Sequence, residues 1–78
     1  MNWQDHISRD PAIMAGKPVI RGTRITVELI LQRLGEGWSE GELLKSYPHL
    51  KTEHLRAALA YAAAALADDE LIDLERAG

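Results

Sequence analysis

Apolar residues recur at two different spacings along this chain of 78 residues, and the spacing changes near residue 26. Before that point, β-branched residues alternate with turn-forming residues such as Asp10-Pro11 and Gly16–Pro18. β-Branched side chains favour extended backbone, whereas proline and glycine favour turns. Residues 6–13 therefore predict a short strand that runs into a turn, and residues 19–25 predict a second extended segment.

Gly22 interrupts the second extended segment between Arg21 and Arg24. Glycine adopts positive φ without a steric cost, so Gly22 predicts a tight turn, and Thr23 is expected to belong to it. A glycine turn also lets backbone amides approach an anion, which makes a phosphate-contacting arm conceivable. For the two arginines, a contact with DNA phosphate and a bond within the fold remain open alternatives.

From residue 26 onward, the apolar residues follow the three-and-four spacing that places them on one face of a helix. Thr26 predicts the N-cap of a first helix, and Gly35 and Gly37 predict its end. The predicted apolar stripe of this helix consists of Val27, Ile30, Leu31 and Leu34.

A second helix is predicted to begin near residue 40. Ser39 and Glu42 have the spacing of a capping box, in which each side chain bonds the other residue's backbone amide. The helix should bury Leu43 and Leu44, and it should end before Pro48, since the residue before a proline is pushed out of the helical conformation.

Thr52 predicts the N-cap of a third helix, whose alanine-rich centre has the highest helix propensity in the chain. Its predicted core stripe consists of Leu55, either Ala58 or Leu59, Ala62 and Leu66. The predicted fold class is mainly α. A short N-terminal β-hairpin arm occupies residues 1–25, a three-helix helix-turn-helix core residues 26–67, and an acidic tail or helix extension residues 68–78.

Charge is distributed unevenly around a formal net charge of −3. Residues 1–34 carry five basic and three acidic residues, whereas residues 35–78 carry four basic and nine acidic residues. The overall sign argues against a protein that coats nucleic acid non-specifically, but it permits a local basic face.

The chain contains no cysteine, which excludes disulfides and thiolate metal sites. No apolar run approaches the roughly 20 residues that cross a bilayer, and the start of the chain lacks the pattern of a signal peptide. We therefore expect a single cytoplasmic domain without a membrane contact.

A short second helix, a turn of about five residues and a longer third helix outline a helix-turn-helix unit. Such units place the leading residues of their second helix against DNA. Lys51 and Thr52 could then contact phosphate, Arg56 could reach a guanine edge, and His54 lies between them. Glu53 lies among these residues and would repel phosphate, so three-helix packing without DNA binding remains the alternative.

No residue pattern indicates catalysis or a metal. The three histidines, His6, His49 and His54, lack the spacing of a helical metal pair, which favours surface or capping roles. No serine, histidine and acid arrangement suggests nucleophilic chemistry. We expect a protein that is not an enzyme and uses no cofactor, and we expect Trp38 to pack the corner between the first two helices.

The Gly-Lys-Pro element at residues 16–18, the Gly-Thr-Arg element at residues 22–24 and the Tyr-Pro element at residues 47–48 resemble one small prokaryotic family. That family is domain of unknown function 433, and the resemblance covers about residues 5–66. It implies a homeodomain-like helical core behind a β-hairpin arm. It also implies the antitoxin of a two-gene toxin–antitoxin pair, whose usual partner is a PIN-like ribonuclease toxin. It supplies no catalytic residues.

The acidic tail alternates acids with large aliphatic residues. Partner contacts are expected from Leu71, Ile72 and Leu74, and Arg76 is the one base of the tail that could enter the acidic metal site of a ribonuclease. Alternatively, the acids mimic RNA phosphates and meet a basic substrate groove. A solvated helix end with no partner is equally open.

Two functions follow from these patterns. The first is a homodimeric antitoxin that binds its own operator DNA through the third helix and neutralises a ribonuclease. A homodimer is expected because alanine side chains bury little apolar area in a lone domain. The second is a protein-interaction module that makes no contact with nucleic acid.

Overall fold

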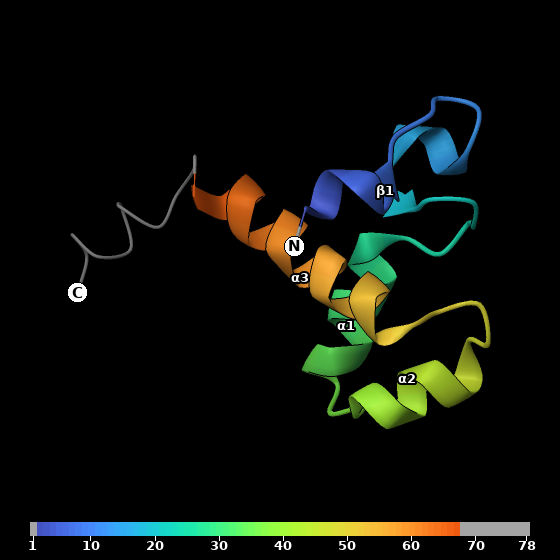
Figure 1. The fold of residues 1–78 in the computed structure, drawn as a ribbon, viewed down its shortest axis with the longest axis vertical. Coiled ribbons are helices and arrows are strands. Elements are labelled where there is room, and N and C mark those ends of the chain that lie inside the picture. The colour runs from blue at the N-terminus through green and yellow to red at the C-terminus, as the bar shows by residue number, and fades with distance from the viewer. Residues whose placement is uncertain (1, 68–78) are drawn as a thin grey trace.

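The structure, a computed structural model, describes residues 2–67 (Figure 1). Two short strands pair near the N-terminus, and three α-helices follow. In chain order the elements are the 3-10 helix η1 (Trp3–Asp5), β1 (Ile7–Ser8), the 3-10 helix η2 (Met14–Gly16), β2 (Val19–Ile20), α1 (Val27–Gly35), α2 (Glu40–Ser46) and α3 (Thr52–Ala67). The predicted fold class, mainly α with an N-terminal β-hairpin, is confirmed.

The hairpin is shorter than the sequence predicts. β1 and β2 are antiparallel, with Ile7 opposite Ile20 and Ser8 opposite Val19. Strand pairing ends there because the carboxylate of Asp10 accepts a hydrogen bond from the backbone N–H of Ala12 at 2.9 Å, which turns the chain into η2.

The turn predicted at Gly22 is confirmed. The N–H of Thr23 donates to the carbonyl oxygen of Ile20 at 2.9 Å, and Gly22 has a φ of +82°. Positive φ at the third position is what a type II turn requires. The Thr23 hydroxyl donates to the carbonyl of Ile20 at 2.8 Å and accepts from the N–H of Ile25 at 3.0 Å, so Thr23 also stabilises this turn.

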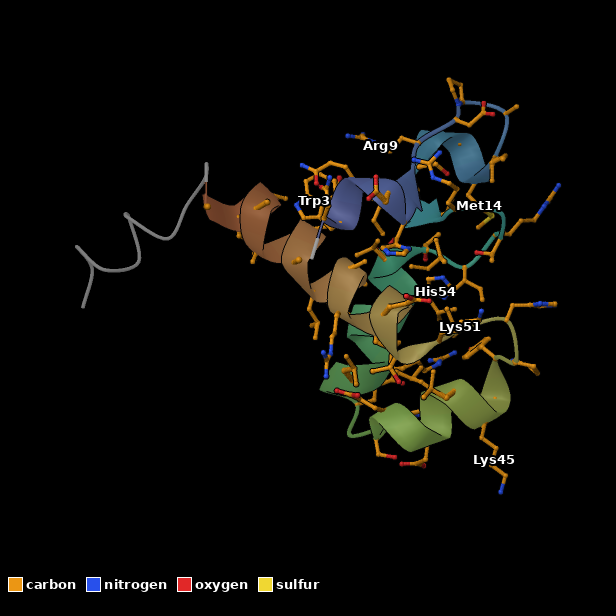
Figure 2. All side chains as sticks on the ribbon, in the orientation of Figure 1. Trp3, Arg9, Met14, Lys45, Lys51 and His54 are labelled. Atoms are coloured by element: carbon orange, nitrogen blue, oxygen red, sulfur yellow. The ribbon has the colours of Figure 1, made fainter. Side chains whose placement is uncertain are left out.

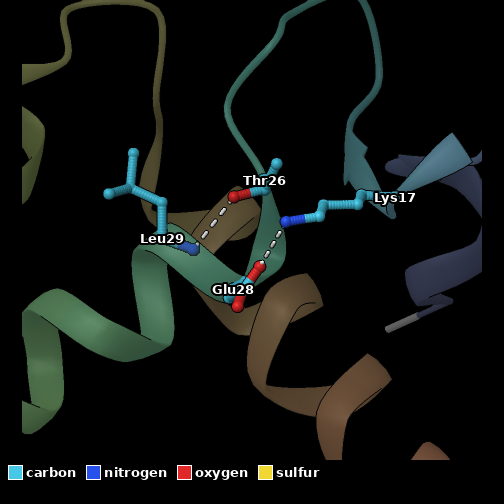
Figure 3. A network of polar contacts seen from close by, with 4 residues as sticks. All are labelled: Lys17, Thr26, Glu28 and Leu29. Atoms are coloured by element: carbon cyan, nitrogen blue, oxygen red, sulfur yellow. Dashed lines mark hydrogen bonds and ion pairs between the residues drawn. The ribbon is translucent and has the colours of Figure 1, made fainter. Parts of the chain in front are cut away.

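Local capping signals fix the starts of the two short helices as predicted. The Thr26 hydroxyl accepts from the N–H of Leu29 at 3.0 Å and begins α1 (Figure 3). Ser39 and Glu42 exchange the two hydrogen bonds of a capping box, at 2.9 and 3.1 Å, and begin α2. After α1 the chain reverses at Gly37, whose φ is +99°.

The start of α3 differs from the prediction. The carbonyl oxygen of Lys51 accepts hydrogen bonds from the N–H groups of His54 and Leu55. The backbone N–H of Lys51 donates to Nδ1 of His54 at 3.0 Å. Lys51 is therefore the capping position and Thr52 the first helical residue, so the prediction that Thr52 caps the helix is wrong. The expected capping role of a histidine is confirmed at His54, whose ring nitrogen replaces the usual Glu carboxylate.

The core joins the hairpin to all three helices. Its buried residues are Ile7, Val19, Ile20, Val27, Ile30, Leu43, Leu50, Leu55, Ala57 and Ala58. The core stripe predicted for α3 is confirmed at Leu55 and, of the alternatives Ala58 and Leu59, at Ala58, which is buried while Leu59 is 43% exposed. It is wrong at Leu66, which is 52% exposed. The physical reason for Leu66 is visible in Figure 1, where the last turns of α3 (orange) extend beyond the other helices.

Two aromatic contacts close the core. Trp38 packs against it at the corner between α1 and α2, as expected, with the guanidinium of Arg33 5.3 Å from its ring centre. The ring of Trp3 meets the ring of Tyr61 edge-on, with 5.1 Å between the ring centres. Trp3 thereby ties the N-terminal segment to the middle of α3. Within residues 2–67, no helix has the length and hydropathy to span a bilayer.

The capping box predicts how stability depends on pH. Hydrogen bonds from the backbone and hydroxyl of Ser39 hold the pKa of Glu42 below its usual value. The stabilisation is therefore present above the unfolded-state pKa and is lost as pH falls through the folded-state pKa. Urea unfolding between pH 7 and about pH 2 should show Glu42→Ala less stable than wild type at neutral pH, with the two converging in acid.

Glu40→Ala is the matched control, because Glu40 lies in the same first turn and makes no side-chain hydrogen bond to the described residues. An equal effect of both substitutions at every pH would contradict a specific role of the capping box.

Candidate nucleic-acid interface

Residues 47–51 join α2 to α3 and set the position of the α3 N-terminus. The N–H of Tyr47 donates to Leu43 at 2.9 Å, which ends α2, and the N–H of Leu50 donates to Tyr47 at 2.9 Å. The side chain of Leu50 is buried in the hydrophobic core, so it holds the turn against the core. Lys51 follows at the surface as the last residue before the helix.

Four exposed side chains surround a shallow depression of about 460 Å³ at the start of α3: Lys51, Thr52, Glu53 and Arg56. We call this surface the α3 leading edge. The structure thus brings together three of the four residues at the start of α3 that the sequence predicts to contact DNA, and it places Glu53 among them. Figure 2 shows Lys51 on the outer side of the helix start.

His54, the fourth predicted residue, turns away from the α3 leading edge. Its ring is half-buried and lies edge-on to the ring of His6, with 5.6 Å between ring centres. Burial lowers the pKa of His54, Glu53 opposes that shift, and His6 and Lys51 add to it. The neutral ring can keep its lone pair on Nδ1 for the N–H of Lys51, so His54 positions Lys51 while facing the hairpin.

Arg21 is engaged within the fold. Its guanidinium donates hydrogen bonds to the carbonyl oxygens of Gln4, Asp5 and Ile7 at distances of 3.1 to 3.2 Å. These bonds satisfy carbonyls at the end of η1 and hold it against the Gly22 turn. Of the two alternatives for Arg21, the geometry therefore favours the structural one.

Arg24 has a different environment. Its side chain is exposed, and among residues 2–67 it forms no hydrogen bond or ion pair. It does not line the depression at the α3 leading edge. The predicted partner-binding residues, Leu71, Ile72, Leu74 and Arg76, lie outside the described residues.

A second surface is a groove that the sequence alone does not single out. It has a volume of about 700 Å³, opens between α1 and the second half of α3, and is mostly apolar. It is lined by Pro18, Val27, Glu28, Leu31, Gln32, Tyr61, Ala62, Ala65 and Leu66. Ala62 and Leu66 belong to the apolar stripe that the sequence predicts for the core, so their spacing alone does not distinguish a groove from a buried face.

Neither surface gathers metal ligands. Among residues 2–67, no three His, Asp or Glu side chains lie close enough together to hold a metal ion. The chemistry available at the α3 leading edge is therefore hydrogen bonding and charge, with two cationic side chains, one hydroxyl and one carboxylate.

Comparison with known proteins places this chain in a family. Residues 7–62 match the family described as "Protein of unknown function (DUF433)". The chain belongs to the DUF433 family. The match runs from β1 into α3 and includes the whole α3 leading edge.

Two relatives extend this finding. A DUF433 member protein from Anabaena variabilis ATCC 29413, solved by crystallography, superimposes with a TM-score of 0.76 at 35% identity, covering 96% of this chain and 71% of that one. The uncharacterized protein y4eO of Sinorhizobium fredii (strain NBRC 101917 / NGR234) is 36% identical over 58 residues. Those residues are 74% of this chain but 26% of y4eO, so this DUF433 chain spans about a quarter of that relative.

The environment of His54 predicts a second pH effect. Because the folded-state pKa of His54 lies below its ordinary value, its contribution to stability is present above about pH 6.5 and is lost as pH falls through the folded-state pKa. His54→Ala should therefore destabilise the protein more at pH 8 than at pH 5, as measured by urea midpoints.

His49→Ala provides the control, because His49 is exposed in the turn before α3. If removal of His49 changed the pH profile as much as removal of His54, the capping contact would not be the cause.

Proposed function

We propose that this chain is the DNA-binding antitoxin of a toxin–antitoxin pair, which binds its own operator as a homodimer and neutralises a PIN-like ribonuclease in the cytoplasm. The observation that supports the DNA-binding half is the α3 leading edge, exposed directly after a short helix and a five-residue turn. The role is one of binding, without catalysis and without a cofactor.

The α3 leading edge offers the two kinds of contact that recognition of DNA needs. The first N–H groups of a helix have no partner within the helix, so those of α3 can donate to a phosphate together with Lys51 and Thr52. Arg56 lies one turn further along the same face as Thr52, and its guanidinium can bond two acceptors of a guanine edge. Arg24, exposed on the hairpin side, supplies a further phosphate contact in this proposal.

The charge at the α3 leading edge favours sequence-specific over non-specific binding of DNA. Each copy offers few positive groups, Glu53 opposes them, and the whole chain carries a net charge of −3. Non-specific affinity depends on the number of phosphates that are neutralised, so a single copy would hold DNA weakly. Two copies on a symmetric operator would double the contacts, which supports the homodimer in the proposal.

The toxin-binding half rests on the resemblance to antitoxins and on the residues of the tail. In this proposal Leu71, Ile72 and Leu74 pack against the ribonuclease, and Arg76 approaches its acidic metal site. An arginine suits that site because its guanidinium bonds carboxylates with two parallel hydrogen bonds.

A protein-interaction module without DNA contact is the second candidate. Two observations favour it: Glu53 is exposed within the α3 leading edge, and an apolar groove lies between α1 and α3. The two candidates differ in whether the protein retards DNA that lies upstream of its own gene.

Charge-matched substitutions test the DNA-binding half. Arg56→Ala should weaken the operator complex by about 1–3 kcal/mol and relax sequence preference, whereas Lys51→Ala should weaken all sequences alike and lower the salt slope by about 1. Gel shifts at several salt concentrations measure both effects. Lys45→Ala is the control, because it removes the same charge from the exposed side of α2 (Figure 2).

Equal retardation of operator and unrelated DNA, or no retardation at low salt, would contradict specific recognition and favour the second candidate.

Co-expression with a neighbouring PIN-like ribonuclease gene tests the toxin-binding half. The double substitution Leu71→Ala and Leu74→Ala should abolish co-purification and restore ribonuclease activity, because it removes the aliphatic contacts. Asp73→Asn, between the same two residues, should change both readouts little. Loss of binding in the Asp73 variant alone would instead support the alternative in which the tail acids meet a basic groove.

A further inference from the structure

The second half of α3 is apolar on its outer side as well as its inner side. Residues 57–67 contain no charged residue, and every residue from 63 to 67 is exposed. Leu59 and Leu66 are large hydrophobic side chains with 43% and 52% of their surface accessible. A helix that is apolar all round is normally buried, so this half of α3 has the character of a covered surface.

The apolar groove beside α1 continues this surface. Ala62 and Leu66 line the groove on the α3 side, and Leu31 lines it on the α1 side. Glu28, the one acid at the groove, is paired with Lys17, whose Nζ lies 3.1 Å from its Oε1 (Figure 3). The ion pair offsets the charge at the groove, so the groove presents little net charge to an incoming surface.

We propose that this surface binds a second copy of the same chain, with the two α3 helices antiparallel and crossing between Ala62 and Ala63. We call the surface the α3 docking face and define it as Leu59, Ala62, Ala63, Leu66 and the adjoining groove. The inference extends the homodimer of the proposed function by naming the surface that forms it.

The spacing of the α3 docking face is self-complementary. Leu59 and Leu66 lie at equal distances from the midpoint between Ala62 and Ala63. In a twofold-symmetric pair the contact of residue i with residue j is repeated in reverse, so Leu59 packs on the partner's Leu66 and the partner's Leu59 packs on Leu66. Alanines at the crossing point allow the helix axes to approach to about 8 Å.

Charge also favours a second copy over other occupants. Two identical chains each carry a net charge of −3, so their mutual repulsion is smallest when they meet through surfaces without charged residues. Residues 57–67 form such a stretch, and they include the whole second half of α3. A strongly acidic or basic partner would find no complementary group on this helix face.

The same crossing point gives a spacing that suits DNA. Thr52 lies between ten and eleven residues from the midpoint, which is about 16 Å along a helix with a rise of 1.5 Å per residue. Antiparallel helices therefore place the two Thr52 residues about 32 Å apart, or somewhat less if the helices cross at an angle. Successive major-groove half-sites on one face of DNA lie about 34 Å apart.

Adjacent alanines provide a matched test of the α3 docking face in the full chain. Ala63→Glu places a charge on the face, whereas Ala64→Glu places it about 100° further around the same helix. Both alanines are exposed, so neither change disturbs the core. Sedimentation equilibrium without DNA should give a dimer for wild type and Ala64→Glu, and at least about a tenfold weaker dimer for Ala63→Glu.

A charge exchange tests the antiparallel register. Leu59→Lys and Leu66→Glu should each weaken the dimer alone. Mixing the two variants should restore it, because the lysine introduced at position 59 of one copy then meets the glutamate introduced at position 66 of the other. A parallel pair would place position 59 against position 59 and would not recover. Circular dichroism of each variant checks that helix content is retained.

Several outcomes would overturn the inference: a monomeric wild type at about 100 µM, an equal effect of Ala63→Glu and Ala64→Glu, or no recovery on mixing. A dimer that persists in Ala63→Glu and is lost when residues 68–78 are removed would assign dimerisation to the tail instead. These measurements contain no DNA and no toxin. Failure of the proposed function would instead appear in the gel shift or in the co-expression experiment, and a dimer of another geometry could still pass both.

Discussion

The burial of Leu55, Ala57 and Ala58 determines which part of α3 reaches solvent. These three residues have no accessible surface, because η1, β1, α1 and α2 all contact α3. A helix buried on that much of its circumference exposes a single narrow strip. In the first turns that strip is Thr52 and Arg56, with Glu53 beside them, so core packing selects the α3 leading edge.

One helix thereby carries two surfaces of different chemistry. The first turns of α3 are held in the core and present charged and polar side chains, whereas the second half lines the groove beside α1 and exposes mainly alanine and leucine. Because an α-helix is stiff, the distance and rotation between the two surfaces are fixed. A dimer formed through the second half would set the separation of the two α3 leading edges without any flexible connection.

The N-terminal segment and the hairpin contact α3 and hold its first turn in place. Arg21 ties three carbonyls of residues 4–7 to the Gly22 turn, and His6 from the same segment contacts His54 in the first turn of the helix. His54 in turn holds the backbone of Lys51. The chain of contacts therefore runs from the N-terminal segment to the α3 leading edge, and it links the position of Lys51 to the protonation of a half-buried imidazole.

The sequence by itself determined the features that depend on neighbours three or four residues apart. The caps at Thr26 and Ser39, the turn at Gly22 and the limits of α1 and α2 are local, because a side chain and a nearby amide meet whatever the rest of the chain does. Only the tertiary structure decided which side of α3 is buried. The alanine-rich stretch offers almost the same hydrophobicity in every direction, so its periodicity could not choose between Ala58 and Leu59 for the core. The bonds of Arg21 also depend on the tertiary structure, because they reach carbonyls that lie fourteen to seventeen residues away in the sequence.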